Sequence, residues 1–414
     1  MFSIEGIIAN TGERKRIEID QTTELITKVG EPTGVADVLL KDELIFPGFV
    51  DLHVHARECT DHSQDYKEDF KTAGVAAING GVVAFAEMPN NPVPPIDNSS
   101  YDAKNILAKK SGVEVLLYAG IGPHTEPLSR KVPYKVFMGP SIGELFFTDK
   151  IDLEKVISKY SGQNVSFHCE DPEILNKNKN ETTHERRRPP EAETSAIDFA
   201  LSMIEKYNLQ GKICHCSTAE GIRKIKNAKM RKVNVVAEVS PHHLYFSGEM
   251  LTENNREWMR MNPPLRTAGD KNYLTEALRD GTIDFLATDH APHSQEEKTV
   301  GMSGTPQLDT YGPFATWLMK ERNFSPEEIA RACSANPGNF FNQFSPNRYG
   351  KIKEGYIGSL TILNINKPTT ITKDILKTKC GWSPFEGITF PGSVAMTIIK
   401  GVAFAKASAD RRNI

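Results

Sequence analysis

Eight short apolar segments, separated by stretches of helical periodicity, occupy the middle of this 414-residue chain. In order they are LIFPGFVDLHVHA, GVVAFAEMPNN, VEVLLYAGIGP, YKVFMGPS, NVSFHCED, KICHCST, VNVVAEVSPHH and IDFLATDHAPH. Segments of this length suit buried parallel strands, and intervening stretches such as 192–207 and 221–229 carry apolar residues at helical spacing. Eight such units predict an α/β fold, a TIM (β/α)8 barrel rather than an open sheet.

Both ends of the chain contain short β-rich pieces broken by Gly, Pro and Asp, which predicts small sheets rather than helices. Neither end can bury its apolar faces alone. We therefore expect one small β-sandwich domain built from both termini, with residues 1–43 as its first part and 345–414 as its second. The barrel would then occupy residues 44–344.

Charge and composition exclude several functional classes. The net charge is −3, with acids and bases spread along the chain, so no footprint for nucleic acid or an anionic membrane is present. We interpret the densest basic run, 186–188, as a solvated loop. No stretch reaches the roughly 18 apolar residues of a membrane span, and the N-terminus has no secretion signal. Six scattered cysteines suit reduced thiols, so we expect a cytoplasmic protein with a small-molecule substrate.

Polar residues lie at or near the ends of the apolar segments, where a TIM barrel places its chemistry. These residues are His53, His55, Lys135, His168, His215 and Asp289. A single buried histidine is more often structural, and a hydrogen-bonded core pair is the alternative for the first two. Four histidines and an aspartate at one level of a barrel favour a shared metal centre, because it would satisfy all these buried polar groups.

Two divalent metals can share a bridging hydroxide and lower its pKa towards neutrality. We expect His53, His55 and Asp289 to hold one metal, and His168 and His215 to hold the other. A bridging anion is still required. The ammonium of Lys135 has no lone pair, but a carbamate formed there with carbon dioxide would supply two oxygens. An ion-paired or snorkelling lysine is the alternative.

A longer set of motifs follows in order along the chain. They are HVHARE, MPNN with PPIDN after it, FHCED, RPPEAE, ICHCST, EVSPHHLYF, MNPPLR and TDHAPHSQEEK. Together they resemble the class I dihydroorotases of the amidohydrolase superfamily, over about residues 44–345. The resemblance implies a cytoplasmic enzyme with two Zn²⁺ per subunit. It also implies the reversible cyclisation of N-carbamoyl-L-aspartate to L-dihydroorotate in pyrimidine biosynthesis.

The resemblance assigns roles to individual residues. Lys135 matches the carboxylated lysine of one subgroup, and the other ligands match the metal set above. Asp289 would also take the proton of the bridging hydroxide and pass it to the leaving nitrogen. The implied substrate-binding residues are Arg57, Asn90, Asn262, His293, Ser303 and Gly304. Cys214 and Glu238 match an additional metal contact, with a packed thiol and a supporting carboxylate as the alternative.

Two other functions stay open at this stage. One is another cyclic amidase, of the allantoinase or hydantoinase type. The function of such an enzyme does not account for Arg57 together with the DHAPH motif. The other is a non-catalytic homologue, against which the complete ligand set argues. The sequence leaves the oligomeric state open, with a homodimer as one option, and also leaves open an association with an aspartate transcarbamoylase.

Overall fold

The computed structural model describes residues 1–140 and 145–405, and its central part is built from parallel strands that pair in sequence order. Strands β5, β6 and β7 are hydrogen-bonded neighbours, and β8 to β13 continue as a second series. Their bounds are β5 Phe49–Val54, β6 Val82–Glu87, β7 Glu114–Leu117, β8 Ala119–Ile121, β9 Tyr134–Phe137, β10 Asn164–His168, β11 Gln210–Ile213, β12 Val235–Val239 and β13 Phe285–Leu286.

Each of the eight apolar segments contains a parallel strand, as predicted. The third segment differs in detail because it forms two strands, β7 and β8, separated by the buried Tyr118. Val54 of β5 forms a parallel bridge with His290, which follows β13, so the first strand lies beside the end of the last. These parallel strands and the helices between them fit a TIM barrel.

Helices follow most of the parallel strands. Their bounds are α1 Phe70–Gly80, α2 Asn98–Ala108, α3 Lys150–Ile157, α4 Pro172–Asn178, α5 His184–Arg187, α6 Pro190–Lys206, α7 Ala219–Met230, α8 Pro241–Tyr245, α9 Ala268–Arg279, α10 Gln295–Thr299, α11 Tyr311–Glu321, α12 Pro326–Ala330 and α13 Asn336–Phe341. The longest, α6, begins with Pro190, which suits a first turn, and buries Ala196, Ala200 and Ile204 on one face. Residues 122–133, all described, connect β8 to β9 without a helix.

Strands from both ends of the chain form one further sheet. Within the described residues its order is β18-β17-β14-β4-β1-β2-β3. The bounds are β1 Phe2–Ile8, β2 Arg14–Asp20, β3 Leu25–Gly30, β4 Val38–Pro47, β14 Leu360–Asn364, β17 Ser393–Ile399 and β18 Val402–Ala405, with a separate pair β15 Thr369–Thr370 and β16 Thr389–Phe390. Ile4, Ile19 and Ile362 belong to a hydrophobic core of this sheet, separate from the main core.

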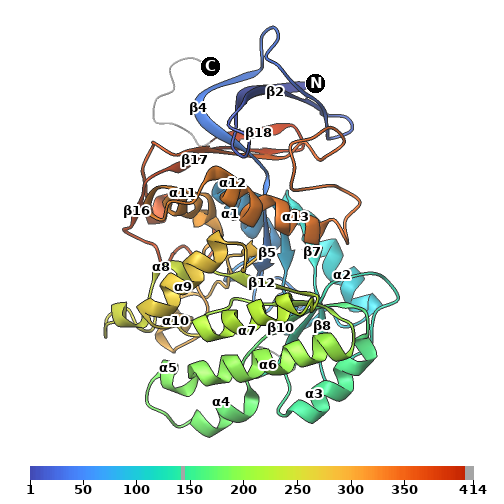
Figure 1. The fold of residues 1–414 in the computed structure, drawn as a ribbon, viewed down its shortest axis with the longest axis vertical. Coiled ribbons are helices and arrows are strands. Elements are labelled where there is room, and N and C mark those ends of the chain that lie inside the picture. Colours follow the sequence, from blue (N-terminus) through green and yellow to red (C-terminus); the bar gives the residue numbers. More distant parts are fainter. Residues whose placement is uncertain (141–144, 406–414) are drawn as a thin grey trace.

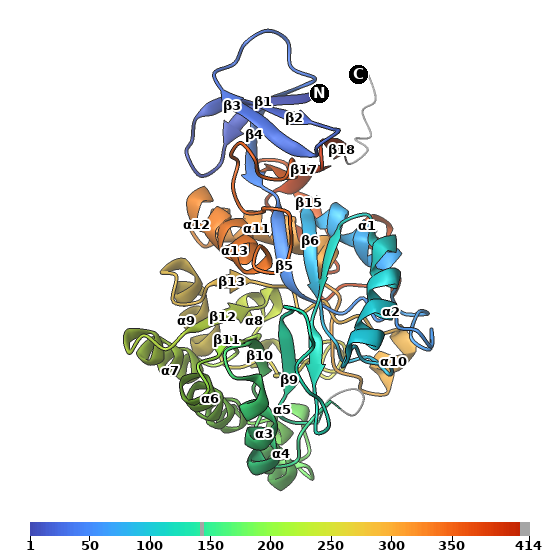
Figure 2. The ribbon, with the colours of Figure 1, turned by 90° about the vertical axis from the view of Figure 1, so that its right-hand side faces the viewer.

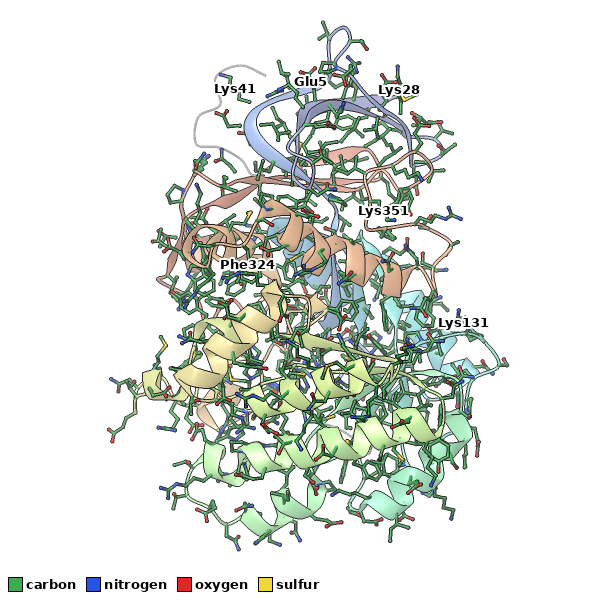
Figure 3. The ribbon with its side chains drawn as sticks, in the orientation of Figure 1. Glu5, Lys28, Lys41, Lys131, Phe324 and Lys351 are labelled. Carbon is green, nitrogen blue, oxygen red and sulfur yellow. The ribbon has the colours of Figure 1, made fainter. Side chains whose placement is uncertain are left out.

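The terminal sheet lies at one end of the elongated molecule (Figures 1 and 2). Helices α11, α12 and α13 lie between this sheet and most of the parallel strands. Glu5, Lys28 and Lys41 belong to strands β1, β3 and β4 of this sheet and lie far from the barrel-like body (Figure 3). β4 leads directly into β5, so the sheet is joined to the first parallel strand by only Gly48. A helix long and apolar enough to cross a membrane does not occur in the described part of the chain.

Candidate metal centre and substrate cavity

The predicted metal ligands converge at the C-terminal ends of the parallel strands. His53 lies in β5 and His55 just beyond it, His168 ends β10, and His215 and Asp289 follow β11 and β13. All five line one cavity of about 420 Å³. The period of two along β5 explains why His53 and His55 face the same way.

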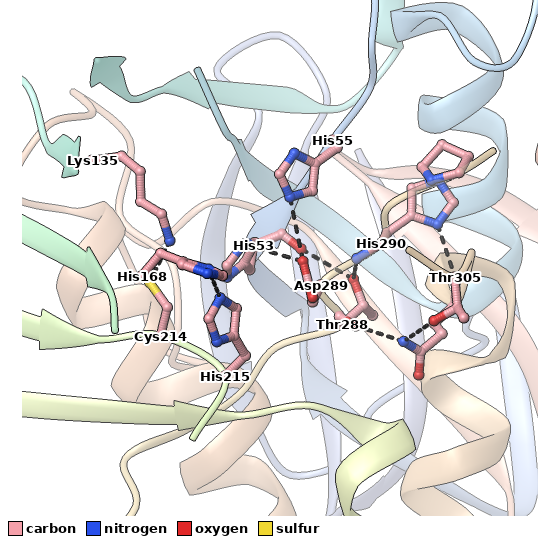
Figure 4. A network of polar contacts seen from close by, with 12 residues as sticks. His53, His55, Lys135, His168, Cys214, His215, Thr288, Asp289, His290 and Thr305 are labelled. Atoms are coloured by element: carbon pink, nitrogen blue, oxygen red, sulfur yellow. Dashed lines mark hydrogen bonds and ion pairs between the residues drawn. The ribbon is translucent and has the colours of Figure 1, made fainter. Parts of the chain in front are cut away.

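His53, His55 and Asp289 form the first half of the site. The Oδ1 atom of Asp289 lies 3.2 Å from Nε2 of His53 and 3.3 Å from Nε2 of His55. The three side chains point toward one another (Figure 4), and their ligand atoms are close enough to hold one ion together. Two imidazole nitrogens and a carboxylate oxygen are a donor set that suits zinc.

His168 and His215 form the second half. Nδ1 of His168 lies 2.8 Å from Nε2 of His215, and the two rings meet edge to face. The His53 ring is 5.2 Å from the His215 ring, centroid to centroid, so the two halves are adjacent. The residues present therefore fit a centre with two metal ions.

The four histidines are in the protonation state that a metal requires. Burial is the largest cause that lowers the pKa of each of them, to about 3 for His53. The positive charge of Lys135 also lowers each of these pKa values. At neutral pH the imidazoles are uncharged, and each keeps a lone pair for an ion.

Lys135 enters the site from β9. Its side chain is fully buried, and Nζ lies 2.8 Å from Sγ of Cys214. The ammonium points toward His168 (Figure 4). A carbamate on this nitrogen would supply an anion close to His168, whereas the ammonium cannot ligate a metal.

Three residues of the site have left-handed backbone conformations that L-residues rarely adopt. The φ angles are 63° at Arg57, 34° at His215 and 48° at Asp289. Such conformations cost of order 1–3 kcal/mol each and persist only where the surrounding structure holds them. With these backbone conformations, the side chains of the turn residues lie over the ends of the preceding strands.

Glu238 and Cys214 lie behind the ligands. Oε1 of Glu238 contacts Nδ1 of His53, and its Oε2 accepts a hydrogen bond from the buried Lys212 at 2.6 Å. Glu238 therefore fixes the tautomer of His53 that leaves Nε2 free for a metal. Glu238, Cys214 and His53 also bring three ligand atoms close together, so the geometry of an additional metal contact is present alongside the supporting role.

The predicted substrate-binding residues meet at the same cavity, with one exception. Arg57, Asn90, Asn262, Ser303 and Gly304 all line it. Among the described residues, Nη1 of Arg57 and Oδ1 of Asn262 are buried without a hydrogen-bond partner. A donor of the guanidinium and an acceptor of the amide are thus available to a ligand.

Gly304 is required by close packing at this cavity. Its φ of 140° lies outside the range of ordinary side-chain-bearing residues, and a Cβ atom would lie 2.5 Å from the carbonyl oxygen of Ala291. A side chain at position 304 would therefore displace the backbone beside the cavity.

His293 is the exception, because it contacts Arg57 but is not among the residues lining the cavity. The side chain is fully buried, and its Nε2 lies 3.3 Å from Nη2 of Arg57. Arg57 also donates from Nε to the carbonyl oxygen of Pro292 at 3.3 Å. The segment 292–293 thus orients the guanidinium.

Comparison with known proteins agrees with this site. Residues 150–403 match the Amidohydrolase family. The chain is 32% identical to the dihydroorotase of Methanosphaera stadtmanae, over 96% of this chain and 94% of that protein. It is 31% identical to the dihydroorotase of Bacillus subtilis, over 95% of each. The chain belongs to the class I dihydroorotases of the amidohydrolase superfamily.

The fold of this dihydroorotase family member is also found in solved structures of hydantoinases. An L-hydantoinase from Arthrobacter aurescens superposes with a TM-score of 0.88, covering 98% of this chain and 96% of that one. Sequence identity is only 22%, so this likeness concerns the fold alone. The higher sequence identity to the dihydroorotases therefore favours a dihydroorotase over a hydantoinase.

The structure corrects our interpretation of the basic run in this dihydroorotase. Arg186 is exposed as expected, but Arg188 is not a solvated loop residue. Its Nη1 pairs with the buried Oε2 of Glu170, which lies 2.8 Å from Nε2 of His168. Glu170 thus orients His168 as Glu238 orients His53. Glu170 in FHCED and Arg188 in RPPEAE were visible as motif residues, but their pairing across 18 residues was not.

Proposed function

We propose that this protein is a zinc-dependent dihydroorotase, which reversibly cyclises N-carbamoyl-L-aspartate to L-dihydroorotate in pyrimidine biosynthesis. The observation that carries the proposal is a single cavity that combines Arg57 with the His53, His55 and Asp289 cluster. The cluster suits hydrolysis of an amide, and the planar guanidinium suits a ring carboxylate.

Two Zn²⁺ ions are the proposed cofactors. His53, His55 and Asp289 would hold one, His168 and His215 the other, and a carbamate on Lys135 would contact both. When bound, the ions supply an activated water and polarise the carbonyl that is attacked. The carboxylates of Glu238 and Glu170 hold the rings of His53 and His168 for this purpose.

The residues of the chain then perform binding and proton transfer. The substrate is bound by Arg57, Asn90, Asn262 and His293, and the guanidinium of Arg57 holds the ring carboxylate. In ring opening the oxygen of water adds to the ring amide carbonyl, and the carbon–nitrogen bond breaks. Asp289 accepts the proton of the water and delivers it to the leaving nitrogen, and ring closure reverses these steps. The Ser303–Gly304 backbone faces the cavity from the loop after β13.

We also propose the domain organisation stated for the sequence. The bridge between Val54 and His290 supports a closed barrel over residues 44–344. The pairing of β14, β17 and β18 with β4 and β1 in one sheet supports a single small domain built from residues 1–43 and 345–414, of which 406–414 lie outside the described residues, and we propose that this domain is a β-sandwich. Localisation in the cytoplasm and a homodimer or transcarbamoylase partner remain parts of the proposal.

The activity is tested on purified protein with measured metal content. We expect it to open dihydroorotate and to close carbamoyl aspartate. Chelation of the metals should abolish both activities, and Zn²⁺ should restore them, because no amide hydrolysis of this kind proceeds without the activated water. Activity on hydantoin or allantoin, but on neither dihydroorotate nor carbamoyl aspartate, would overturn the proposal in favour of another cyclic amidase.

Replacing Arg57 with methionine should separate substrate binding from the metals. Methionine has a similar length and suits a buried position, but it cannot donate to a carboxylate. We expect the KM for dihydroorotate to rise by about 10- to 100-fold, as loss of a charged hydrogen-bonding partner predicts. The zinc content should equal that of the wild type. Unchanged kinetics would remove Arg57 from the substrate site.

A further inference from the structure

Glu193, in the first turns of α6, is buried against the turn that carries His215. Its Oε1 accepts hydrogen bonds from the backbone N–H groups of Ser217 at 2.9 Å and Thr218 at 3.2 Å, and from the hydroxyl of Thr218 at 3.1 Å. Its Oε2 accepts from the hydroxyl of Ser217. One carboxylate from the helix after β10 thus holds two residues of the loop after β11.

All of these contacts direct a hydrogen at Glu193. Oγ of Ser217 accepts from Nε of Arg266 at 3.0 Å, and Oγ1 of Thr218 accepts from the backbone N–H of Gly221 at 3.1 Å. Neither of these nitrogen groups can accept in return, so each hydroxyl gives its own hydrogen to the carboxylate. A site with donors on every side matches an ionised carboxylate, which only accepts.

The turn at His215 needs support because of its backbone conformation. The φ angle of 34° is one that L-residues rarely adopt, and it persists only where the surrounding structure holds it. Glu238 holds one side of the turn, because its Oε1 accepts from the N–H of His215 at 3.3 Å and its carbonyl oxygen accepts from the N–H of Cys216 at 2.9 Å. Glu193 holds the two residues that follow, so the turn is fixed from both directions.

Arg266 extends this network toward the other histidine of the second metal position. Its Nη2 lies 3.8 Å from Oε2 of Glu193, and its Nη1 donates to the carbonyl oxygen of Arg188 at 2.6 Å. The guanidinium of Arg188 pairs in turn with Glu170, whose Oε2 lies 2.8 Å from Nε2 of His168. Segments that follow β10, β11 and β12 therefore meet at Glu193 and Arg266.

We infer that Glu193 is a positioning residue for His215, and through it for the second metal ion. It fixes the turn before an ion binds, so that Nε2 of His215 already faces Nδ1 of His168, 2.8 Å away. The ligands of the first ion belong to β5 and to the loops after β5 and β13, which are other elements. Loss of Glu193 should therefore weaken binding of the second ion more than that of the first. The inference rests on the proposed function, because it takes the centre with two ions as its premise.

The test titrates Glu193→Gln with Zn²⁺ in competition with a zinc-binding dye. Glutamine has the same size, but its amide nitrogen donates and so cannot replace a carboxylate oxygen that is surrounded by donors. We expect the second zinc ion to bind about 10- to 100-fold more weakly, as loss of a group that orients a metal ligand predicts, and the first to bind as in the wild type. Glu205→Gln removes the same charge from an exposed position of α6 and should leave both affinities unchanged. Wild-type affinity for the second ion in Glu193→Gln would overturn the inference.

Two further measurements separate this role from a merely structural one. Excess Zn²⁺ should restore the kcat of Glu193→Gln with the KM for dihydroorotate unchanged, which a general loss of folded structure would not allow. Ser217→Ala keeps the carboxylate and removes one donor, so it should weaken the second ion by about two- to tenfold, the order of one hydrogen bond. Equal weakening of both ions in either variant would overturn the inference. A wild type that binds two zinc ions but does not act on dihydroorotate would instead contradict the proposed function.

Discussion

Replacing Lys135 with methionine is expected to reduce turnover by at least about a thousandfold and to lower the zinc content below two ions per chain. Methionine matches the length of lysine and suits the buried position, so the fold should persist. It has no amine to react with carbon dioxide, so the proposed bridging anion is lost. Measurements of kcat, of metal content by mass spectrometry and of the unfolding midpoint check this result.

The wild type supplies a control for the carbamate itself. Metal-free protein should regain activity faster when Zn²⁺ is added with bicarbonate than in buffer freed of carbon dioxide. Lys131→Met makes the same substitution at an exposed lysine and should leave turnover and zinc content unchanged. Two zinc ions and normal turnover in Lys135→Met would contradict the proposal. An electron-density map with an unmodified Lys135 beside both ions would do so as well.

The sequence predicted the succession of parallel strands because most residues of these strands are buried on both faces, so the strands are rich in apolar residues. The sequence did not predict where an individual strand is interrupted. The third segment is interrupted at Tyr118, whose hydroxyl donates to the carbonyl oxygen of Leu52 on another strand. That contact spans 66 residues, and no local pattern reports it.

The convergence of the candidate metal ligands was predictable for a different reason. Histidines at the ends of apolar segments are costly unless something satisfies them, so their positions alone indicated a shared centre. The supporting carboxylates are another matter, because Glu238 reaches His53 from a different strand and Glu170 is held by Arg188 from a separate segment. A glutamate in a motif shows that a carboxylate is present, but only the fold shows which histidine it orients.

The placement of His293 shows the same limit. Its motif suggested contact with substrate, and the structure shows a contact with Arg57, which lines the cavity, although His293 is not itself among the lining residues. The left-handed conformation of Arg57 brings the guanidinium to this position, and the sequence gives no sign of a positive φ at an arginine. Backbone geometry of this kind depends on the surrounding loops.

Asp289→Asn should have the second large effect, a fall in kcat of about 100- to 10,000-fold in both directions, as loss of a general acid–base predicts. Asparagine keeps an oxygen at the position that faces His53 and His55, so part of the metal affinity should remain. It cannot accept a proton from water or return one to nitrogen. The KM for dihydroorotate should change little, because Arg57 holds the carboxylate.

The basicity of Asp289 depends on its charged surroundings. Burial raises the pKa of its carboxyl group to about 8, and the positive charge of Lys135 acts in the opposite direction. Bound dications lower the pKa of such a group further, which keeps it ready to accept a proton at neutral pH. In the wild type, kcat should therefore fall at low pH as the general base becomes protonated. This fall should be absent from the residual activity of Asp289→Asn. A variant that retains both zinc ions and turns over within tenfold of the wild type would show that another group carries the proton.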